Sequence, residues 1–136
     1  MIETLIIIRT KNEDRWIKYT IEKILKQKYQ KFEIVVVDNY STDRTIEIVK
    51  KFKTIKLVKL DNNKGVGNAR NVGSGIAKHE ILCFIDSDLV ITNNSIVNLI
   101  KKLNQNSNIG SVSAIQEMIN LNTKNWSSNF VCLKSC

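Results

Sequence analysis

The chain has 136 residues, of which 43% are apolar and 25% are charged, and this balance excludes an intrinsically disordered protein. Its longest apolar runs, residues 5–8 and 34–37, are too short to cross a bilayer, and Glu3 stands where a signal peptide carries positive charge. The net charge of +8 comes from scattered lysines, which argues against a nucleic-acid-binding module and suits anionic ligands or an anionic membrane surface. From length, composition and the short apolar runs we expect one cytosolic domain over residues 1–136.

Apolar runs of strand length alternate with amphipathic stretches of helix length from the first residues onward. Residues 5–8 and 33–37 are expected strands, because both are short apolar runs rich in β-branched residues, as buried parallel strands require. The stretch between them predicts a helix, because apolar residues recur on one face at helical spacing. That face consists of Ile17, Ile21, Ile24 and Leu25.

Two more helices and one more strand follow. Ser41 or Thr42 is expected to cap the first of these helices, strand 56–60 comes next, and the second helix opens after a turn at residues 64–67. Gly73 and Gly75 lower the helical propensity of that second helix, and close packing would explain them. The expected core residues are Ile46, Val49 and Phe52 for the first helix and Ala69, Val72 and Ile76 for the second.

The last part of the chain begins with a fourth strand at residues 80–85 and a helix with the clearest apolar periodicity in the sequence. That helix should pack through Ile96, Leu99, Ile100 and Leu103. Residues 110–118 then predict a strand, residues 120–129 a polar loop and residues 130–133 a final strand. The whole alternation predicts an α/β fold with an open, mostly parallel sheet flanked by helices.

The cysteines are odd in number and contain no C-x-x-C pair. Cys83, Cys132 and Cys136 could be drawn with His79 as four zinc ligands, but Cys83 lies in an apolar strand, where a buried structural thiol is commoner. We therefore expect reduced thiols and no disulfide framework.

Polar residues follow three of the expected strands, at positions 9–13, at Asp38, and at Asp86 and Asp88. In an open parallel sheet the carboxyl ends of the strands share one edge, where ligands bind, so these groups should converge. Two carboxylates spaced as Asp86 and Asp88 suit Mg²⁺ or Mn²⁺ bridging a diphosphate. The alternative is an Asx-turn that starts the next helix.

Arg70 lies one turn into the helix that follows Gly65 and Gly67, near a helix end that favours anions. It could pair with a phosphate or with one of the strand-end carboxylates. A purely structural ion pair is the alternative, and the two roles are compatible.

Four segments carry a family resemblance. Residues 9–13 read R-T-K-N-E against the pattern P-T-x-N-E, with Arg9 where proline is usual, and residues 37–45 read V-D-N-Y-S-T-D-R-T against V-D-D-x-S-x-D-x-T. Residues 63–71 and 84–88 match N-x-G-x-x-x-A-R-N and F-x-D-x-D in full. With these motifs in order at their expected strand ends, residues 4–103 resemble glycosyltransferase family 2, which has the Rossmann-like GT-A fold.

The resemblance implies a nucleotide-sugar site that contains a divalent ion. Thr10 and Glu13 would line the nucleoside pocket, and Asp38 would hydrogen-bond the base, typically uracil. Asp86 would lie by the ribose and the metal, and Asp88 would be the direct ligand of Mg²⁺ or Mn²⁺.

The resemblance also implies an activity. Arg70 would lie near the diphosphate of a donor such as a UDP-sugar, and the sugar would pass with inversion to a sugar, lipid-linked or protein acceptor that the sequence does not name. A later Asp or Glu would be the general base. Glu117, the one carboxylate after Asp88, matches that position poorly. We therefore expect a truncated GT-A domain without the acceptor-binding segment, and the alternative is an inactive nucleotide-sugar-binding domain.

A dinucleotide-binding oxidoreductase is a rival interpretation, because a Gly65-x-Gly67 turn follows a strand. Arg70 occupies the third glycine position, however, and the turn follows the third strand rather than the first. A nucleic-acid-binding module would fit a pI near 9.5, but the chain has neither aromatic-rich strands nor a clustered basic helix.

Overall fold

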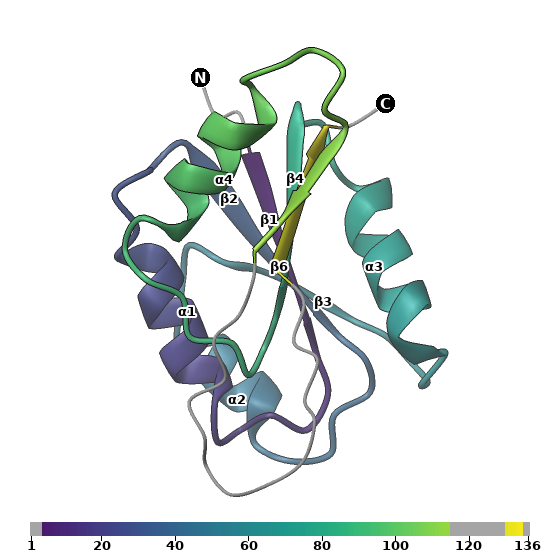
Figure 1. The fold of residues 1–136 in the computed structure, drawn as a ribbon. Coiled ribbons are helices and arrows are strands. Elements are labelled where there is room, and N and C mark those ends of the chain that lie inside the picture. Colours follow the sequence, from purple (N-terminus) through teal and green to yellow (C-terminus); the bar gives the residue numbers. More distant parts are fainter. Residues whose placement is uncertain (1–3, 115–129, 135–136) are drawn as a thin grey trace, which may run out of the picture.

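A computed structural model describes residues 4–114 and 130–134 and shows a six-stranded sheet with helices on both faces (Figure 1). The strands are β1 (Thr4–Thr10), β2 (Phe32–Asp38), β3 (Lys56–Lys59), β4 (Ile81–Asp86), β5 (Ser111–Ser113) and β6 (Phe130–Lys134). The helices are α1 (Ile17–Leu25), α2 (Thr45–Val49), α3 (Gly65–Gly75) and α4 (Ser95–Leu103). The predicted α/β class and strand–helix alternation are confirmed.

The strand order is β3-β2-β1-β4-β6-β5. The first four strands run parallel, whereas β6 pairs antiparallel with both β4 and β5. The carboxyl ends of the parallel strands therefore lie together along one end of the sheet, which we call the strand-end edge, and β6 begins there. In register, Thr10 of β1 lies beside Asp38 of β2, and Arg9 lies beside Asp86 of β4.

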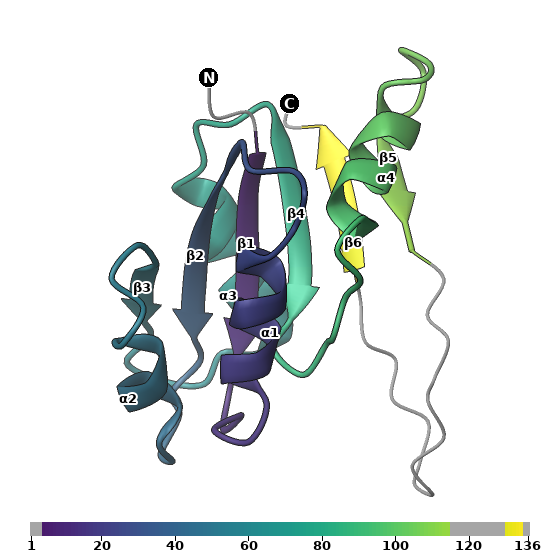
Figure 2. The same cartoon turned by 90° about the vertical axis from the view of Figure 1, so that its left-hand side faces the viewer.

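Alternate residues of the central strands contribute to two apolar layers, one on each face of the sheet. Figure 2 shows α1 in front of the sheet and α3 behind it. In β1, Ile6 and Ile8 join the layer with α1, α2 and α4, while Ile7 faces α3. A Cβ on Gly73 of α3 would lie 2.5 Å from Cγ2 of Ile7, so this glycine lets α3 approach the sheet closely. Gly75 has no such neighbour within 4 Å, so close packing explains only the first of the two glycines.

The helices confirm most of the predicted core faces. Ile17, Ile21 and Ile24 of α1 are fully buried, but Leu25, the last residue of the helix, is 37% exposed. Ile76 is also exposed, because α3 ends one residue earlier. All four predicted core residues of α4 are buried.

Two predicted helix starts are wrong. Residues 65–67 belong to α3 itself rather than to a turn before it. Helix α2 begins at Thr45 without a side-chain cap, and Ser41 instead accepts a hydrogen bond from the backbone of Asn12. The side chain that accepts a hydrogen bond from the first amide of α2 is that of Asp43, at 2.9 Å from the nitrogen of Thr45.

The expectation of reduced thiols is wrong for two cysteines. Cys83 of β4 and Cys132 of β6 lie directly opposite each other and form a disulfide. Both are fully buried, and cross-strand partners in antiparallel pairs are close enough for such a bond. The predicted final strand is confirmed as β6. The predicted strand at 110–118 is described only in part, as β5, and the predicted loop at 120–129 lies outside the described residues. In the described ranges, no helix is long and apolar enough to cross a membrane.

Candidate functional site

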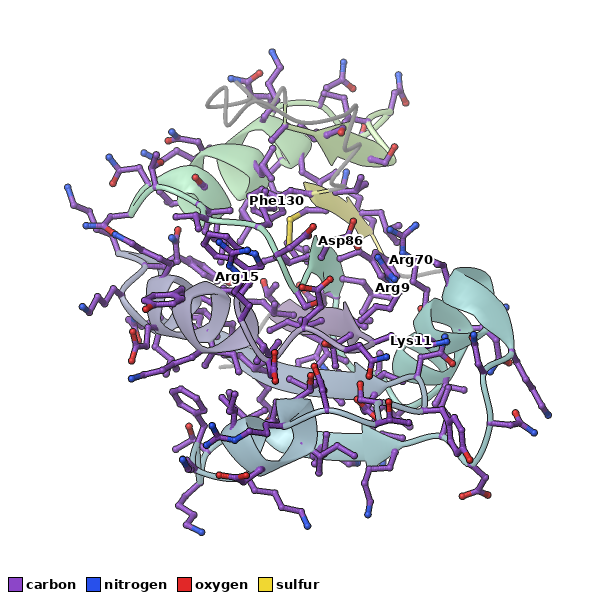
Figure 3. The ribbon with its side chains drawn as sticks, turned by 90° about the horizontal axis from the view of Figure 1, so that it is seen from below. Arg9, Lys11, Arg15, Arg70, Asp86 and Phe130 are labelled. Atoms are coloured by element: carbon purple, nitrogen blue, oxygen red, sulfur yellow. A yellow bond between two sulfur atoms is a disulfide. The ribbon has the colours of Figure 1, made fainter. Side chains whose placement is uncertain are left out.

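The polar strand ends converge as predicted. Figure 3 looks onto the edge where the four parallel strands end, and Asp86 lies there with Arg9 and Arg70 around it. Thr10 and Asp38 end the neighbouring strands β1 and β2, and Asp88 follows β4. One sheet edge therefore carries groups from three strands and from helix α3.

Backbone and side chains join the loop after β1 to the loop after β2. The amide of Asn12 donates to Oγ of Ser41 at 2.8 Å, and the amide of Thr42 donates to Oδ1 of Asn12 at 2.8 Å. The amide of Glu13 donates to Oγ1 of Thr45 at 2.8 Å. Two motifs that lie far apart in sequence are thus joined by hydrogen bonds into one loop pair. Asn12, which the sequence analysis did not nominate, makes two of these bonds.

Asp43 holds the same two loops together. Its Oδ1 accepts from the amide of Thr45 at 2.9 Å, and its Oδ2 accepts from the amide of Asp14 at 3.1 Å. Burial by itself would raise the pKa of Asp43, but the hydrogen bonds from the hydroxyl and amide of Thr45 and the amide of Asp14 together lower it. Asp43 therefore acts as a charged acceptor that shapes the loops.

Several buried polar atoms at this edge have no hydrogen-bonding partner among the described residues. They are Oγ1 of Thr10, Oδ1 of Asp38 and Oδ1 of Asn39. The other ends of two of these side chains are fixed, because Oδ2 of Asp38 accepts from the amide of Ser41 at 3.0 Å and Nδ2 of Asn39 donates to Asn63 at 2.8 Å. Buried polar atoms are normally paired, so their gathering at adjoining strand ends indicates a binding site for a polar ligand.

Two arginines converge on Asp86. Nη2 of Arg9 and Nη2 of Arg70 lie 3.3 Å and 3.4 Å from Oδ1 of Asp86, whose side chain is only 7% exposed. Of the two partners considered for Arg70, a phosphate or a strand-end carboxylate, the structure shows the carboxylate. The sequence analysis did not nominate Arg9 as a site residue. A usable signal was present, because Arg9 replaces the usual proline in the motif of residues 9–13, which also contains Thr10 and Glu13.

Glu13 and Asp88 add negative charge beside Asp86. Burial and the neighbouring carboxylate of Asp88 raise the pKa of Glu13, and the guanidinium of Arg9 partly offsets this. Such crowding of carboxylates is relieved by a bound cation. The alternative of an Asx-turn that starts the next helix is wrong, because α4 begins only at Ser95.

The residues present fit a divalent ion of the Mg²⁺ or Mn²⁺ type. Carboxylate oxygens are the ligands these ions prefer, and Mg²⁺ is commonly held by one or two carboxylates, with water and substrate phosphates completing its coordination. Asp86 and Asp88 supply such a pair. Within the described ranges no group of three or more Asp, Glu, His or Cys residues forms a complete metal cage, so phosphate or water oxygens would have to contribute.

Comparison with known proteins gives a consistent result. The family described as glycosyl transferase family 2 matches residues 5–133. The glycosyltransferase GlyG of Streptococcus pneumoniae serotype 4 is 31% identical over 104 residues, which cover 74% of this chain and 35% of GlyG. The β-1,3-glucosyltransferase WfaP of Escherichia coli, whose name gives UDP-Glc as donor, is 40% identical over 85 residues, which cover 61% of this chain and 34% of WfaP.

Solved structures agree with the sequence relatives. Staphylococcus aureus TarS in complex with UDP-GlcNAc matches with a TM-score of 0.70 and 32% identity, covering 76% of this chain and 31% of the TarS chain. The mannosyltransferase PcManGT of Pyrobaculum calidifontis, in complex with GDP-Man and Mn²⁺, matches with a TM-score of 0.80 and 28% identity, covering 85% of this chain and 36% of that one. The described fold is therefore the GT-A fold, and the chain spans about a third of the length of GlyG, WfaP and these two solved chains.

Proposed function

The chain belongs to glycosyl transferase family 2, and from that premise we propose that its strand-end edge binds the nucleoside diphosphate of a sugar donor, with UDP-sugars as the preferred class. The observation that carries the proposal is the set of buried, unpaired polar atoms on Thr10, Asp38 and Asn39. A nucleoside offers the N–H and O–H groups that such acceptors need.

Asp38 is the proposed reader of the base. Its Oδ2 is already used by the amide of Ser41, which orients the carboxylate and leaves Oδ1 as a fixed acceptor. An imide N–H such as that of uracil would satisfy this atom, and Thr10 beside it would take a second polar group of the nucleoside. Glu13, whose backbone is held by Thr45, closes the same pocket from the loop after β1.

Asp88 is the proposed direct ligand of Mg²⁺ or Mn²⁺, with Asp86 close to the metal and the ribose. A bound divalent ion would offset the charge that develops on the departing nucleoside diphosphate. Arg70 contributes a fixed positive charge near the same phosphates while it holds Asp86. Support comes from the crowding of Glu13, Asp86 and Asp88, which a cation would relieve.

The proposed reaction is an inverting sugar transfer. An acceptor hydroxyl oxygen would bond to the anomeric carbon, the bond from that carbon to the diphosphate would break, and a base would take the hydroxyl proton. We assign no described residue as that base, and the acceptor class stays open among sugars, lipid-linked sugars and proteins. A domain that binds the donor without transferring sugar is the second candidate, because no described residue is assigned as the base. A cytosolic location, which the sequence led us to expect, is at odds with the Cys83–Cys132 disulfide, because disulfides are rare in a reducing cytosol.

The test is calorimetric titration of UDP and GDP with and without Mn²⁺. Wild type should bind UDP more tightly than GDP, and Mn²⁺ should strengthen binding. Asp88→Asn should reduce the gain in UDP affinity that Mn²⁺ produces by a factor of roughly ten to a hundred. Glu22→Gln, which removes a carboxylate of α1 that lies 3.9 Å from the ammonium group of Lys18, is the matched control and should bind as wild type does.

Three results separate the candidates. Absence of UDP and GDP binding by wild type would refute the donor site. Binding with unchanged metal dependence in Asp88→Asn would refute the metal assignment. Binding without release of UDP, when donor and a panel of acceptors are supplied, would favour the non-transferring domain.

A further inference from the structure

Arg9 and Arg70 share one carboxylate oxygen. Arg9 comes from the end of β1 and Arg70 from α3, and the Nη2 atoms of both point at Oδ1 of Asp86 (Figure 3). Each guanidinium has five N–H donors, whereas a carboxylate has two oxygens to offer. The site therefore holds more donors than Asp86 can satisfy.

Arg9 and Arg70 each direct Nη2 at the same oxygen of Asp86, at 3.3 Å and 3.4 Å. Arg44, whose contacts have the same lengths, instead places both Nε and Nη2 on the two oxygens of Glu47, one arginine to one carboxylate. The Nε of Arg9 is buried and has no acceptor within the described part of the chain. Arg9 is thus the incompletely satisfied member of the cluster.

The register of the sheet places Arg9 between the two ends of the proposed donor. Asp38, the proposed base reader, ends β2, and Asp88, the proposed metal ligand, follows β4. Strand β1 lies between β2 and β4, and its Arg9 is the register partner of Asp86. A ligand with its base at β2 and its phosphates at β4 must cross the end of β1, which carries this guanidinium.

The charges of the proposed site agree with this position. Glu13, Asp38, Asp86 and Asp88 carry two negative charges more than Arg9 and Arg70 supply, and a divalent ion would bring this set to neutrality. Without Arg9 the same set with its ion would keep one negative charge, which would oppose the binding of a diphosphate. Arg9 therefore removes a surplus of negative charge from the proposed site.

Resting on the function proposed above, we propose that Arg9 is a donor-binding residue: it donates hydrogen bonds to the diphosphate of the nucleotide sugar while Arg70 keeps hold of Asp86. A proline at this position, the usual residue of the motif, has no side-chain donor and cannot make that contact.

The experiment compares UDP with uridine, which has the base and ribose but no phosphate, by NMR titration in the presence of Mg²⁺. Arg9→Gln should weaken UDP binding roughly tenfold or more and leave uridine binding unchanged, because a hydrogen bond to a charged group is lost. Arg9→Lys should recover part of the UDP affinity. Lys78→Gln removes one positive charge from the exposed loop before β4, at the opposite edge, and should leave both affinities as in wild type.

A double variant distinguishes a direct contact between Arg9 and the diphosphate from an indirect role in which Arg9 only holds Asp86. In Asp86→Asn protein, adding Arg9→Gln should still cost UDP affinity by a similar factor, because the lost contact is to phosphate. If the second substitution has no effect in that background, Arg9 acts only by holding Asp86 and the proposal is overturned.

The remaining outcomes are equally decisive. Equal losses for UDP and uridine in Arg9→Gln would show a change in pocket shape and overturn the proposal, as would unchanged UDP binding. Failure of wild type to bind either UDP or GDP would instead refute the underlying donor site. The wild-type titration thus tells the two failures apart.

Discussion

The parallel and antiparallel parts of the sheet differ in what their strand ends contain and in what holds them together. Strands β1, β2 and β4 end in Thr10, Asp38 and Asp86, and the parallel part is held by apolar layers on both faces. Strand β6 adds no charged side chain at that edge, and a disulfide ties it to β4. The disulfide thus joins the antiparallel part to β4, the strand that ends in Asp86.

Strand direction explains the difference. Parallel strands bring their carboxyl ends to one edge, so each can contribute the polar residues that follow a buried run. Strand β6 runs the other way and reaches the same edge with its first residue, Phe130, which is buried beside Ile85. An antiparallel neighbour therefore closes the apolar layer next to Asp86 instead of extending the polar site.

Reduction of the disulfide should produce the largest effect on stability and should sharpen this comparison. The Cys83–Cys132 bond closes a loop with a sequence separation of 49, so its loss should lower the free energy of unfolding by about 2–4 kcal/mol. UDP affinity of the folded protein should change little, because no proposed site residue is in β6. Urea unfolding with and without reductant measures the first effect.

The double variant Cys83→Ala/Cys132→Ala is the control, because its unfolding should not respond to reductant. Equal stability of oxidised and reduced wild type would contradict a stabilising role of the disulfide between β4 and β6. In a reducing cytosol, where disulfides are rare, the antiparallel strands β5 and β6 would be the less stable part of the sheet.

A pair of glycine substitutions in α3 tests how the parallel part is held. Gly73→Ala places a methyl group against the fully packed Ile7, so we expect a loss of about 1–2 kcal/mol after the gain in helical propensity. Gly75→Ala meets no atom within 4 Å and should instead be neutral or stabilising by up to about 1 kcal/mol. Thermal unfolding compares them, and equal effects of the two substitutions would refute the close contact between α3 and β1.

The smallest expected effect concerns the loops at the functional edge. The lowered pKa of Asp43 means that its carboxylate adds stability above its ordinary pKa of 3.8, and that this stability is lost as pH falls through the lowered value. Asp43→Asn should therefore lower stability at pH 7 by less than about 1 kcal/mol, since solvent screens this partly exposed group, and should match wild type near pH 2. A difference that persists in full at pH 2 would contradict a charge-based role.

Local sequence patterns predicted much of the fold. The β-branched runs around Ile7 and Val36 identified the central strands, and the periodicity from Ile96 to Leu103 identified α4, because both patterns reflect burial on defined faces. Helix ends were less predictable, as Leu25 and Ile76 show. Burial there depends on which neighbouring element covers the last turn, and local spacing does not contain that information.

Contacts between distant segments account for what the sequence missed at the site. The motifs placed Asp38 and Asp86 at strand ends, but the pairing of Cys83 with Cys132 depends on the register of an antiparallel neighbour, which follows from no local pattern. Likewise, the contact of Arg9 with Asp86 requires β1 and β4 to be adjacent, although they are far apart in the chain. Knowledge of the strand order would have sufficed to find it.

The central claim is that the carboxyl ends of β1, β2 and β4 form one binding site for a divalent ion and a nucleoside diphosphate. Paramagnetic Mn²⁺ added to isotope-labelled protein with UDP tests it directly, with Mg²⁺ as the diamagnetic reference. The account predicts line broadening strongest at residues 86–88 and 9–13, together with UDP-dependent shifts at Asp38. Broadening centred on His79 and Glu33, whose side chains lie 3.4 Å apart at the opposite end of the sheet, with no response at the strand ends, would contradict it.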